Sequence, residues 1–113
     1  MVRLKNAKAK GSAFERIVKK MIQKQEPDTE VFRSPASLGS ADLIAINKTG
    51  VSTPILMIFS KVRLIQCKYL KKYMSKKESI KLLEDAERLG ATAWLVFREK
   101  PRGRIKFQRL MPP

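Results

Sequence analysis

The sequence predicts an α/β fold in which a central mixed β-sheet is flanked by helices. Two stretches carry apolar residues three and four positions apart, as amphipathic helices do, and the segments between and after them have the apolar or alternating patterns of strands. The expected order is helix, three or four strands, helix, two strands, which is typical of α/β proteins. A chain of 113 residues also has the size of one domain, so residues 1–113 are expected to fold together.

The first helix is expected to begin at Ser12, after a flexible basic arm over residues 1–11 that is suited to lie along phosphates. Ser12 and Glu15 have the spacing of a capping box. Glu15 therefore has two interpretations, one as the residue that closes the first helical turn and one as a ligand in a site formed with Asp42. The positions expected to face inward follow the helical spacing and are Phe14, Ile17, Val18, Met21 and Ile22.

Two strands are expected on either side of a loop rich in Ser, Pro and Gly. Residues 30–33 lead into this loop, and the run that Asp42 opens, residues 42–46, is apolar enough for a buried strand. Residues 47–50 are a turn signal typical of a hairpin. The apolar run 55–59 beyond the turn either extends the hairpin or forms an exposed patch that pairs with a second subunit.

A third strand is expected over residues 64–69, and its side chains alternate between the two faces of the sheet. Gln66 and Lys68 therefore share one face, and Ile65, Cys67 and Tyr69 share the other. Residues 91–97, which include Trp94 as a core residue, suit a central strand covered on both faces, and residues 104–109 suit an edge strand with its basic residues outward.

The second helix is expected to open with a capping box formed by Ser75 and Glu78 and to end at Gly90. Glu78, Glu84 and Glu87 are interpreted as ordinary surface charges. The positions expected to face inward are Ile80, Leu82, Leu83, Ala86 and Leu89.

The formal net charge of +15 points to nucleic acid as the partner, while a hydrophobic fraction of 43% is enough for a folded core. One cysteine excludes an internal disulfide, and the absence of histidine leaves hard cations with oxygen ligands as the expected metals. No signal-peptide pattern opens the chain, and residues 55–59 are too short to span a bilayer. We therefore expect a cytoplasmic protein that does not bind membranes.

Asp42 is the only carboxylate between residues 31 and 77, and it stands where a loop enters a buried strand. Taken alone, it could be a loop cap or an ion-pair partner of a lysine, just as Lys68 could be a solvated strand end. Together with Gln66, however, these two residues supply a carboxylate, an amide oxygen and an ammonium, which can hold a divalent cation beside a phosphate. This combination indicates a metal-dependent nuclease site, with Cys67 as a core residue rather than a nucleophile.

Four motifs together resemble the archaeal-type Holliday junction resolvases of the PD-(D/E)xK nuclease superfamily. They lie at residues 10–16, 32–37, 41–45 and 65–68. The resemblance implies a restriction-endonuclease-like fold and a homodimer that nicks four-way DNA junctions symmetrically with Mg²⁺, or with Mn²⁺ in its place. Glu15, Asp42 and Lys68 match the acid, acid and lysine of the family.

The resemblance also implies roles for further residues. Ser37 and Arg33 match residues of the loop beside the active site, and Gln66 stands where the family usually has glutamate, which removes one negative charge from the metal site. The metal ligands are therefore expected to be Glu15, Asp42 and Gln66, with Lys68 and Ser37 completing the catalytic set. Residues expected to contact DNA are Lys10, Arg16, Arg33, Ser37, Lys71 and Lys72.

Two alternative functions remain open at this point. One is a restriction-like or repair nuclease that acts on duplex or flap DNA with the same fold. The other is a nucleic-acid-binding module without catalysis, in which Gln66 marks a decayed site.

Overall fold

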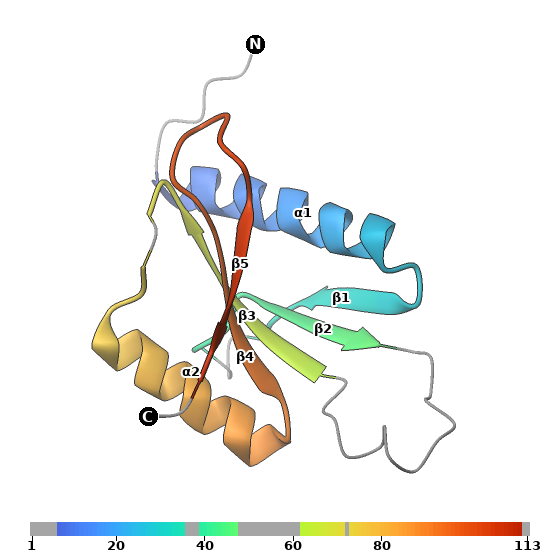
Figure 1. Ribbon diagram of the computed structural model, residues 1–113, viewed down its shortest axis with the longest axis vertical. Helices are drawn as coiled ribbons and strands as arrows, with labels where there is room; N and C mark the ends of the chain where they lie inside the picture. The colour runs from blue at the N-terminus through green and yellow to red at the C-terminus, as the bar shows by residue number, and fades with distance from the viewer. Residues whose placement is uncertain (1–6, 36–38, 48–61, 72, 112–113) are drawn as a thin grey trace.

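The computed structural model describes residues 7–35, 39–47, 62–71 and 73–111. Within these residues, a mixed sheet of five strands lies between two helices (Figure 1). The elements follow one another as α1 (Ala7–Gln25), β1 (Thr29–Arg33), β2 (Leu43–Asn47), β3 (Val62–Tyr69), α2 (Lys76–Leu89), β4 (Thr92–Arg98) and β5 (Lys106–Leu110). The predicted fold class and order of elements are confirmed.

The strands lie in the sheet in the order in which they occur in the chain, β1-β2-β3-β4-β5. All neighbouring pairs are antiparallel except β3 and β4, which are parallel. A parallel pair needs a crossover connection, and α2 provides it. β4 is therefore an inner strand and β5 an edge strand, as predicted.

Each helix covers one face of the sheet. Phe14, Val18 and Ile22 of α1 pack on a core that includes Ile65 of β3, and Leu82 and Ala86 of α2 pack on a core that includes Leu64. Because adjacent strand residues point to opposite faces, these two cores lie on opposite sides of β3. Trp94 is half-buried and packs against the core on the α1 side, as expected.

Helix α1 begins at Ala7, so the prediction that it starts at Ser12 was wrong. Alanine and lysine are strong helix formers, and Gly11 costs a helix interior only about 1 kcal/mol relative to alanine, so the basic arm becomes helical from Ala7 onward. Ser12 consequently lies inside the helix and cannot be its N-cap. The interpretation of Glu15 as half of a capping box is therefore also wrong.

Helix α2 has both ends that the sequence predicts. The Glu78 N–H donates to Ser75 Oγ at 3.1 Å, the Ser75 N–H donates to Glu78 Oε1 at 3.2 Å, and Gly90 ends the helix in the left-handed region with φ of 67°. The inward set was only partly right. Leu82 and Ala86 are buried and Leu83 is half-buried, but Ile80 and Leu89 are each 46% exposed.

The buried stripe of α2 contains an acid that the apolar pattern did not reveal. Asp85 is only 4% exposed, and it accepts a hydrogen bond from Ser40 Oγ. Its other oxygen lies 3.3 Å from an Arg88 guanidinium nitrogen and 3.6 Å from Lys81 Nζ. Ser40 lies two residues before Asp42, so this buried contact ties the loop that delivers Asp42 to α2.

Three predicted features lie wholly or partly outside the described residues: residues 1–6 of the basic arm, the turn at 47–50 and the apolar run 55–59. No helix among the described ranges is long and apolar enough to cross a membrane.

We predict that Asp85→Asn lowers the free energy of unfolding at pH 7 by about 1 to 3 kcal/mol, the usual cost of disturbing a buried hydrogen-bonded group. The Ser40 hydroxyl, followed by Arg88 and Lys81, lowers the pKa of Asp85 below its ordinary 3.8. A lowered carboxyl pKa stabilises the fold above the unfolded-state pKa, and this contribution is lost as pH falls below it. The difference between wild type and variant should therefore shrink from pH 4 toward pH 3 in urea titrations.

The control for this prediction is Glu84→Gln on the exposed side of the same helix, which should change stability by less than about 0.5 kcal/mol. A stability difference for Asp85→Asn that stays constant over the acidic range would show that the charge of Asp85 does not stabilise the fold.

Candidate active site

Asp42 lies immediately before β2 and is fixed by three hydrogen bonds. Its backbone N–H donates to the Ile65 carbonyl at 2.8 Å, and its carbonyl accepts from the Ser34 N–H at 2.9 Å. Its carboxylate Oδ2 accepts from the Cys67 N–H at 2.7 Å. Because Cys67 stands between Gln66 and Lys68, this last bond anchors the carboxylate beside the two polar side chains that the sequence associates with it.

The environment of Asp42 disfavours its negative charge. Burial is the largest influence and raises its pKa above the ordinary 3.8, and the charge of Glu78 raises it further. The Cys67 N–H, Lys68 and Arg33 act in the opposite direction. A partly buried carboxylate whose charge is not fully compensated attracts a cation, and such groups concentrate at functional sites.

The two faces of β3 differ as predicted. Ile65, Cys67 and Tyr69 pack on the α1 side, whereas Gln66 and Lys68 lie on the α2 side. Burial, followed by the charges of Asp42 and Glu15, raises the pKa of the Cys67 thiol far above its ordinary value. Since the thiolate is the reactive form, Cys67 is a neutral core residue and not a nucleophile.

Lys68 forms a close ion pair with Glu78 of α2, at 2.6 Å between Nζ and Oε2. The side chain of Lys68 is 17% exposed, so the ammonium is largely enclosed. The interpretation of Glu78 as an ordinary surface charge was therefore wrong. The sequence did contain a signal for its position, because a capping-box glutamate always lies at the first turn of its helix.

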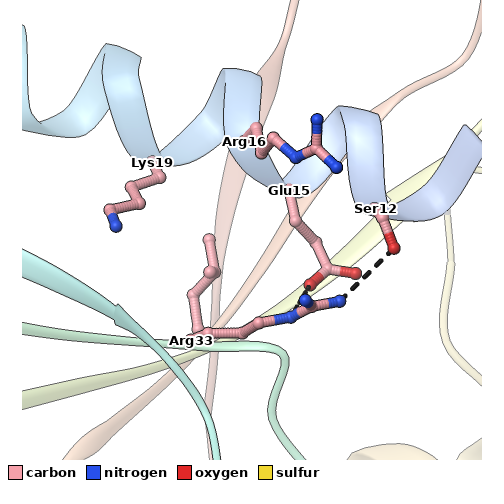
Figure 2. A pocket seen from close by; sticks show the side chains of 6 residues that line it. Ser12, Glu15, Arg16, Lys19 and Arg33 are labelled. Atoms are coloured by element: carbon pink, nitrogen blue, oxygen red, sulfur yellow. Dashed lines mark hydrogen bonds and ion pairs between the residues drawn. The ribbon is translucent and has the colours of Figure 1, made fainter. Parts of the chain in front are cut away.

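Glu15 approaches the site from α1, on the other face of the sheet. Figure 2 shows Arg33 reaching from β1 to two residues of α1: its Nε lies 3.9 Å from Glu15 Oε1, and its terminal nitrogen donates to Ser12 Oγ at 3.3 Å. Burial, followed by the charge of Asp42, raises the pKa of Glu15, and Arg33 opposes this effect. Glu15 and Asp42 are thus close enough to influence one another.

Two pockets are lined by residues of this region, one on each face of the sheet, and Asp42 itself lines neither of them. The smaller, of about 100 Å³, is on the α1 side, and the larger, of about 360 Å³, is on the α2 side. The smaller is lined by Ser12, Glu15, Arg16, Lys19, Arg33 and Leu43. The larger is lined by Gly39, Ser40, Gln66, Lys77, Glu78 and Lys81.

The described residues offer oxygen donors that suit Mg²⁺. They contain no ready-made group of three or more His, Cys, Asp or Glu side chains placed to hold a metal ion. Magnesium, however, is usually held by one or two carboxylates and completed by waters and substrate phosphates. Asp42 and Glu15 are two partly buried carboxylates that influence one another, and Gln66 carries an amide oxygen on the opposite face of β3 from Cys67.

The structure describes the positions of only some of the remaining predicted site residues. Arg16 and Lys71 are exposed, and Arg16 lies at the smaller pocket. Lys10 belongs to α1, but its side chain is outside the described part, as are Ser37 and Lys72. The sequence did not single out Lys19 at the smaller pocket, or Lys77 and Lys81 at the larger one. In the sequence, these lysines cannot be told apart from other charged residues on an exposed helical face.

The sequence matches the family model of the archaeal Holliday junction resolvases (Hjc) over residues 6–111. The chain belongs to this family. The resemblance seen in the sequence motifs is thereby confirmed, and with it a nuclease family whose members act on Holliday junctions in DNA recombination. No curated protein matches the sequence.

The fold of this resolvase is similar to that of Archaeoglobus fulgidus Hjc, a Holliday junction resolvase from an archaeal hyperthermophile. The two share 23% sequence identity, the TM-score is 0.66, and the match covers 89% of this chain and 73% of that one. The predicted α/β fold, a mixed sheet flanked by helices, therefore matches the fold of that resolvase.

We predict that Asp42→Asn raises the melting temperature of the resolvase at pH 7 in the absence of divalent metal. A carboxyl whose folded pKa is raised stabilises the fold only at low pH, and this contribution is lost as pH rises from the unfolded pKa through the folded one. Asparagine removes the charge and retains an oxygen for the Cys67 N–H. Thermal melts of both proteins, with and without 10 mM EDTA, measure the effect.

The same melts with added Mg²⁺ test metal binding separately. A ligand that binds only the folded state at 100 times its dissociation constant stabilises it by about 2.7 kcal/mol. Mg²⁺ should therefore raise the melting temperature of wild type more than that of Asp42→Asn. Equal shifts would mean that the ion binds elsewhere.

Proposed function

We propose that this resolvase nicks two strands of a four-way DNA junction symmetrically, as a homodimer and with Mg²⁺. The observation that supports this most directly is the carboxylate of Asp42 anchored on the Cys67 N–H, between Gln66 and Lys68 and within electrostatic reach of Glu15. Two acids, an amide and a lysine around one strand end are suited to phosphodiester hydrolysis.

Each residue has a proposed role in the reaction. Glu15, Asp42 and the side-chain oxygen of Gln66 would hold Mg²⁺, which polarises the phosphate and activates water when it is bound. Lys68 would orient the attacking water or neutralise the scissile phosphate. Ser37, in the loop before Asp42, would contact the same phosphate through its hydroxyl.

The basic surface would supply affinity for DNA. Arg16, exposed beside the smaller pocket, and Arg33, whose exposed side chain lies 3.9 Å from Glu15, would contact backbone phosphates on the α1 side. Lys10, Ser37, Lys71 and Lys72 are proposed to extend these contacts. Phosphate contacts carry no sequence information, so selectivity would come from junction geometry and a twofold dimer matched to it. The proposed location of the protein is the cytoplasm, where it would meet such a DNA substrate.

The uncharged Gln66 favours a second candidate, a junction-binding protein without catalysis. Losing a negative charge at a hard-cation site weakens cation affinity. This candidate predicts tight binding of junctions and no cleavage with Mg²⁺ or Mn²⁺.

We predict that Asp42→Ala and Lys68→Ala each abolish Mg²⁺-dependent nicking of a synthetic four-way junction while leaving junction binding within about threefold. The cleavage assay should compare the junction with a linear duplex and a flap of the same sequences, and gel shifts in EDTA should measure binding. Loss of a single catalytic group commonly costs two or more orders of magnitude in rate, so the difference between these variants and wild type should be easy to measure.

The matched control is Asp28→Ala, which removes an exposed carboxylate from the turn between α1 and β1 and should nick at the wild-type rate. Wild-type protein that binds junctions but never cuts them would establish the binding module instead. Equal cleavage of junction and duplex would favour a restriction-like or repair nuclease.

We predict that Arg16→Gln reduces the slope of log affinity against log salt by about 1, the value for one lost phosphate contact. Arg16 is exposed beside the smaller pocket, so the substitution should not affect folding. Lys24→Gln, at the other end of the exposed face of α1, should leave the slope closer to that of wild type. Binding isotherms between 50 and 300 mM NaCl measure the slopes of both variants. Equal slopes for wild type and Arg16→Gln would show that Arg16 does not contact a DNA phosphate.

A further inference from the structure

We infer that Glu78 is a positioning residue of the active site: from α2, it supplies the carboxylate partner of Lys68 that the neutral Gln66 cannot supply from β3. The inference rests on the proposed function, because it assigns Lys68 a catalytic role. It adds a residue outside the set that the sequence motifs indicate.

The contact itself is short, and it joins an enclosed lysine to a glutamate whose side chain is 40% exposed. Lys68 Nζ lies 2.6 Å from Glu78 Oε2, and the lysine side chain is only 17% exposed. Gln66 and Lys68 share the α2 face of β3, and Gln66 lines the same pocket as Glu78. On this face of β3, the side chain two residues before Lys68 is therefore the neutral amide of Gln66. The carboxylate that pairs with Lys68 comes instead from Glu78 of α2.

Glu78 is unusually well placed to hold a lysine, because the helix cap has already ordered its side chain. Oε1 accepts a hydrogen bond from the Ser75 N–H at 3.2 Å, and Oε2 receives the ammonium of Lys68. Surface ion pairs contribute only about 0 to 1 kcal/mol, in part because two long side chains lose rotamer freedom. Here one partner is fixed by the cap, and the other is fixed by its enclosed position on β3.

This arrangement has two consequences for the site. The flexible four-carbon stem of a lysine samples many positions unless something holds its head, and Glu78 provides that hold. Glu78 also adds negative charge near Asp42, whose pKa it raises, and it balances the positive charge that Lys68 would otherwise place beside a bound cation. Removing the charge of Glu78 should therefore disturb both Lys68 and the affinity for Mg²⁺.

The helix cap and the ion pair can be separated by two substitutions. Glu78→Gln keeps the side-chain length and an oxygen for the Ser75 N–H but removes the charge facing Lys68. Ser75→Ala removes the hydroxyl that accepts from the Glu78 N–H but leaves the carboxylate in place. Each variant is tested for thermal stability without metal, Mg²⁺ binding by calorimetry, and single-turnover nicking of a four-way junction.

The expected result is a division between these measurements. Glu78→Gln should slow nicking by at least tenfold and weaken Mg²⁺ binding severalfold, and it should also lower the melting temperature, because the enclosed Lys68 loses its charged partner. Ser75→Ala should lower the melting temperature and nick within about twofold of wild type. The double variant Gln66→Glu/Glu78→Gln moves the carboxylate to the same face of β3, two residues from Lys68, and should recover most of the lost rate and Mg²⁺ affinity.

Two results would overturn the inference. One is Glu78→Gln that nicks and binds Mg²⁺ like wild type. The other is a parallel loss of stability and rate in Glu78→Gln and Ser75→Ala with no recovery in the double variant, which would mean that Glu78 acts only as a cap. Failure of the proposed function appears differently, as wild-type protein that never nicks. The calorimetric comparison would then still decide whether Glu78 contributes to the Mg²⁺ site.

Discussion

The hydrogen bond from the Cys67 N–H to the Asp42 carboxylate is the contact on which the rest of the site depends. It joins the start of β2 to the middle of β3, and backbone hydrogen bonds from Asp42 to Ile65 and Ser34 hold the same junction on both sides. The carboxylate consequently has one position relative to Gln66 and Lys68. Without this bond, the backbone of Asp42 would still be held against β3, but its carboxylate would have no fixed position relative to Gln66 and Lys68.

The site is built at some cost to stability. Burial raises the pKa of both Asp42 and Glu15, which means that the fold holds two acids in places that disfavour their charges. Arg33 Nε lies 3.9 Å from Glu15 Oε1, and the arginine side chain is largely exposed. This ion pair therefore offsets little of the unfavourable charge of Glu15. Proteins commonly keep such unfavourable carboxylates where a bound cation will compensate their charge. The strong positive charge of the protein has a separate effect, because it attracts the negatively charged DNA backbone.

Helix α2 does more than connect two parallel strands. Glu78 and Asp85 are seven residues apart, about two helical turns, so both acids face the sheet. One holds Lys68 on β3, and the other holds Ser40 in the loop that precedes Asp42. Between them, Leu82 packs on the core formed with Leu64 and Ala41. The helix therefore fixes two of the segments that carry the site, by two charged contacts and one apolar contact.

The sequence by itself determined the order of the elements, the cap and end of α2, and the two faces of β3, because these follow from periodicity and turn chemistry within short stretches of chain. The early start of α1 also follows from local helix propensity, although the prediction overlooked it. Tertiary structure decided the burial of Asp85 and the pairing of Lys68 with Glu78. The contacts that complete the site join residues that are 10, 25 and 45 positions apart, and no local pattern encodes them. They exist because α2 packs on one face of the sheet and thereby brings its acids against β3 and the loop before β2.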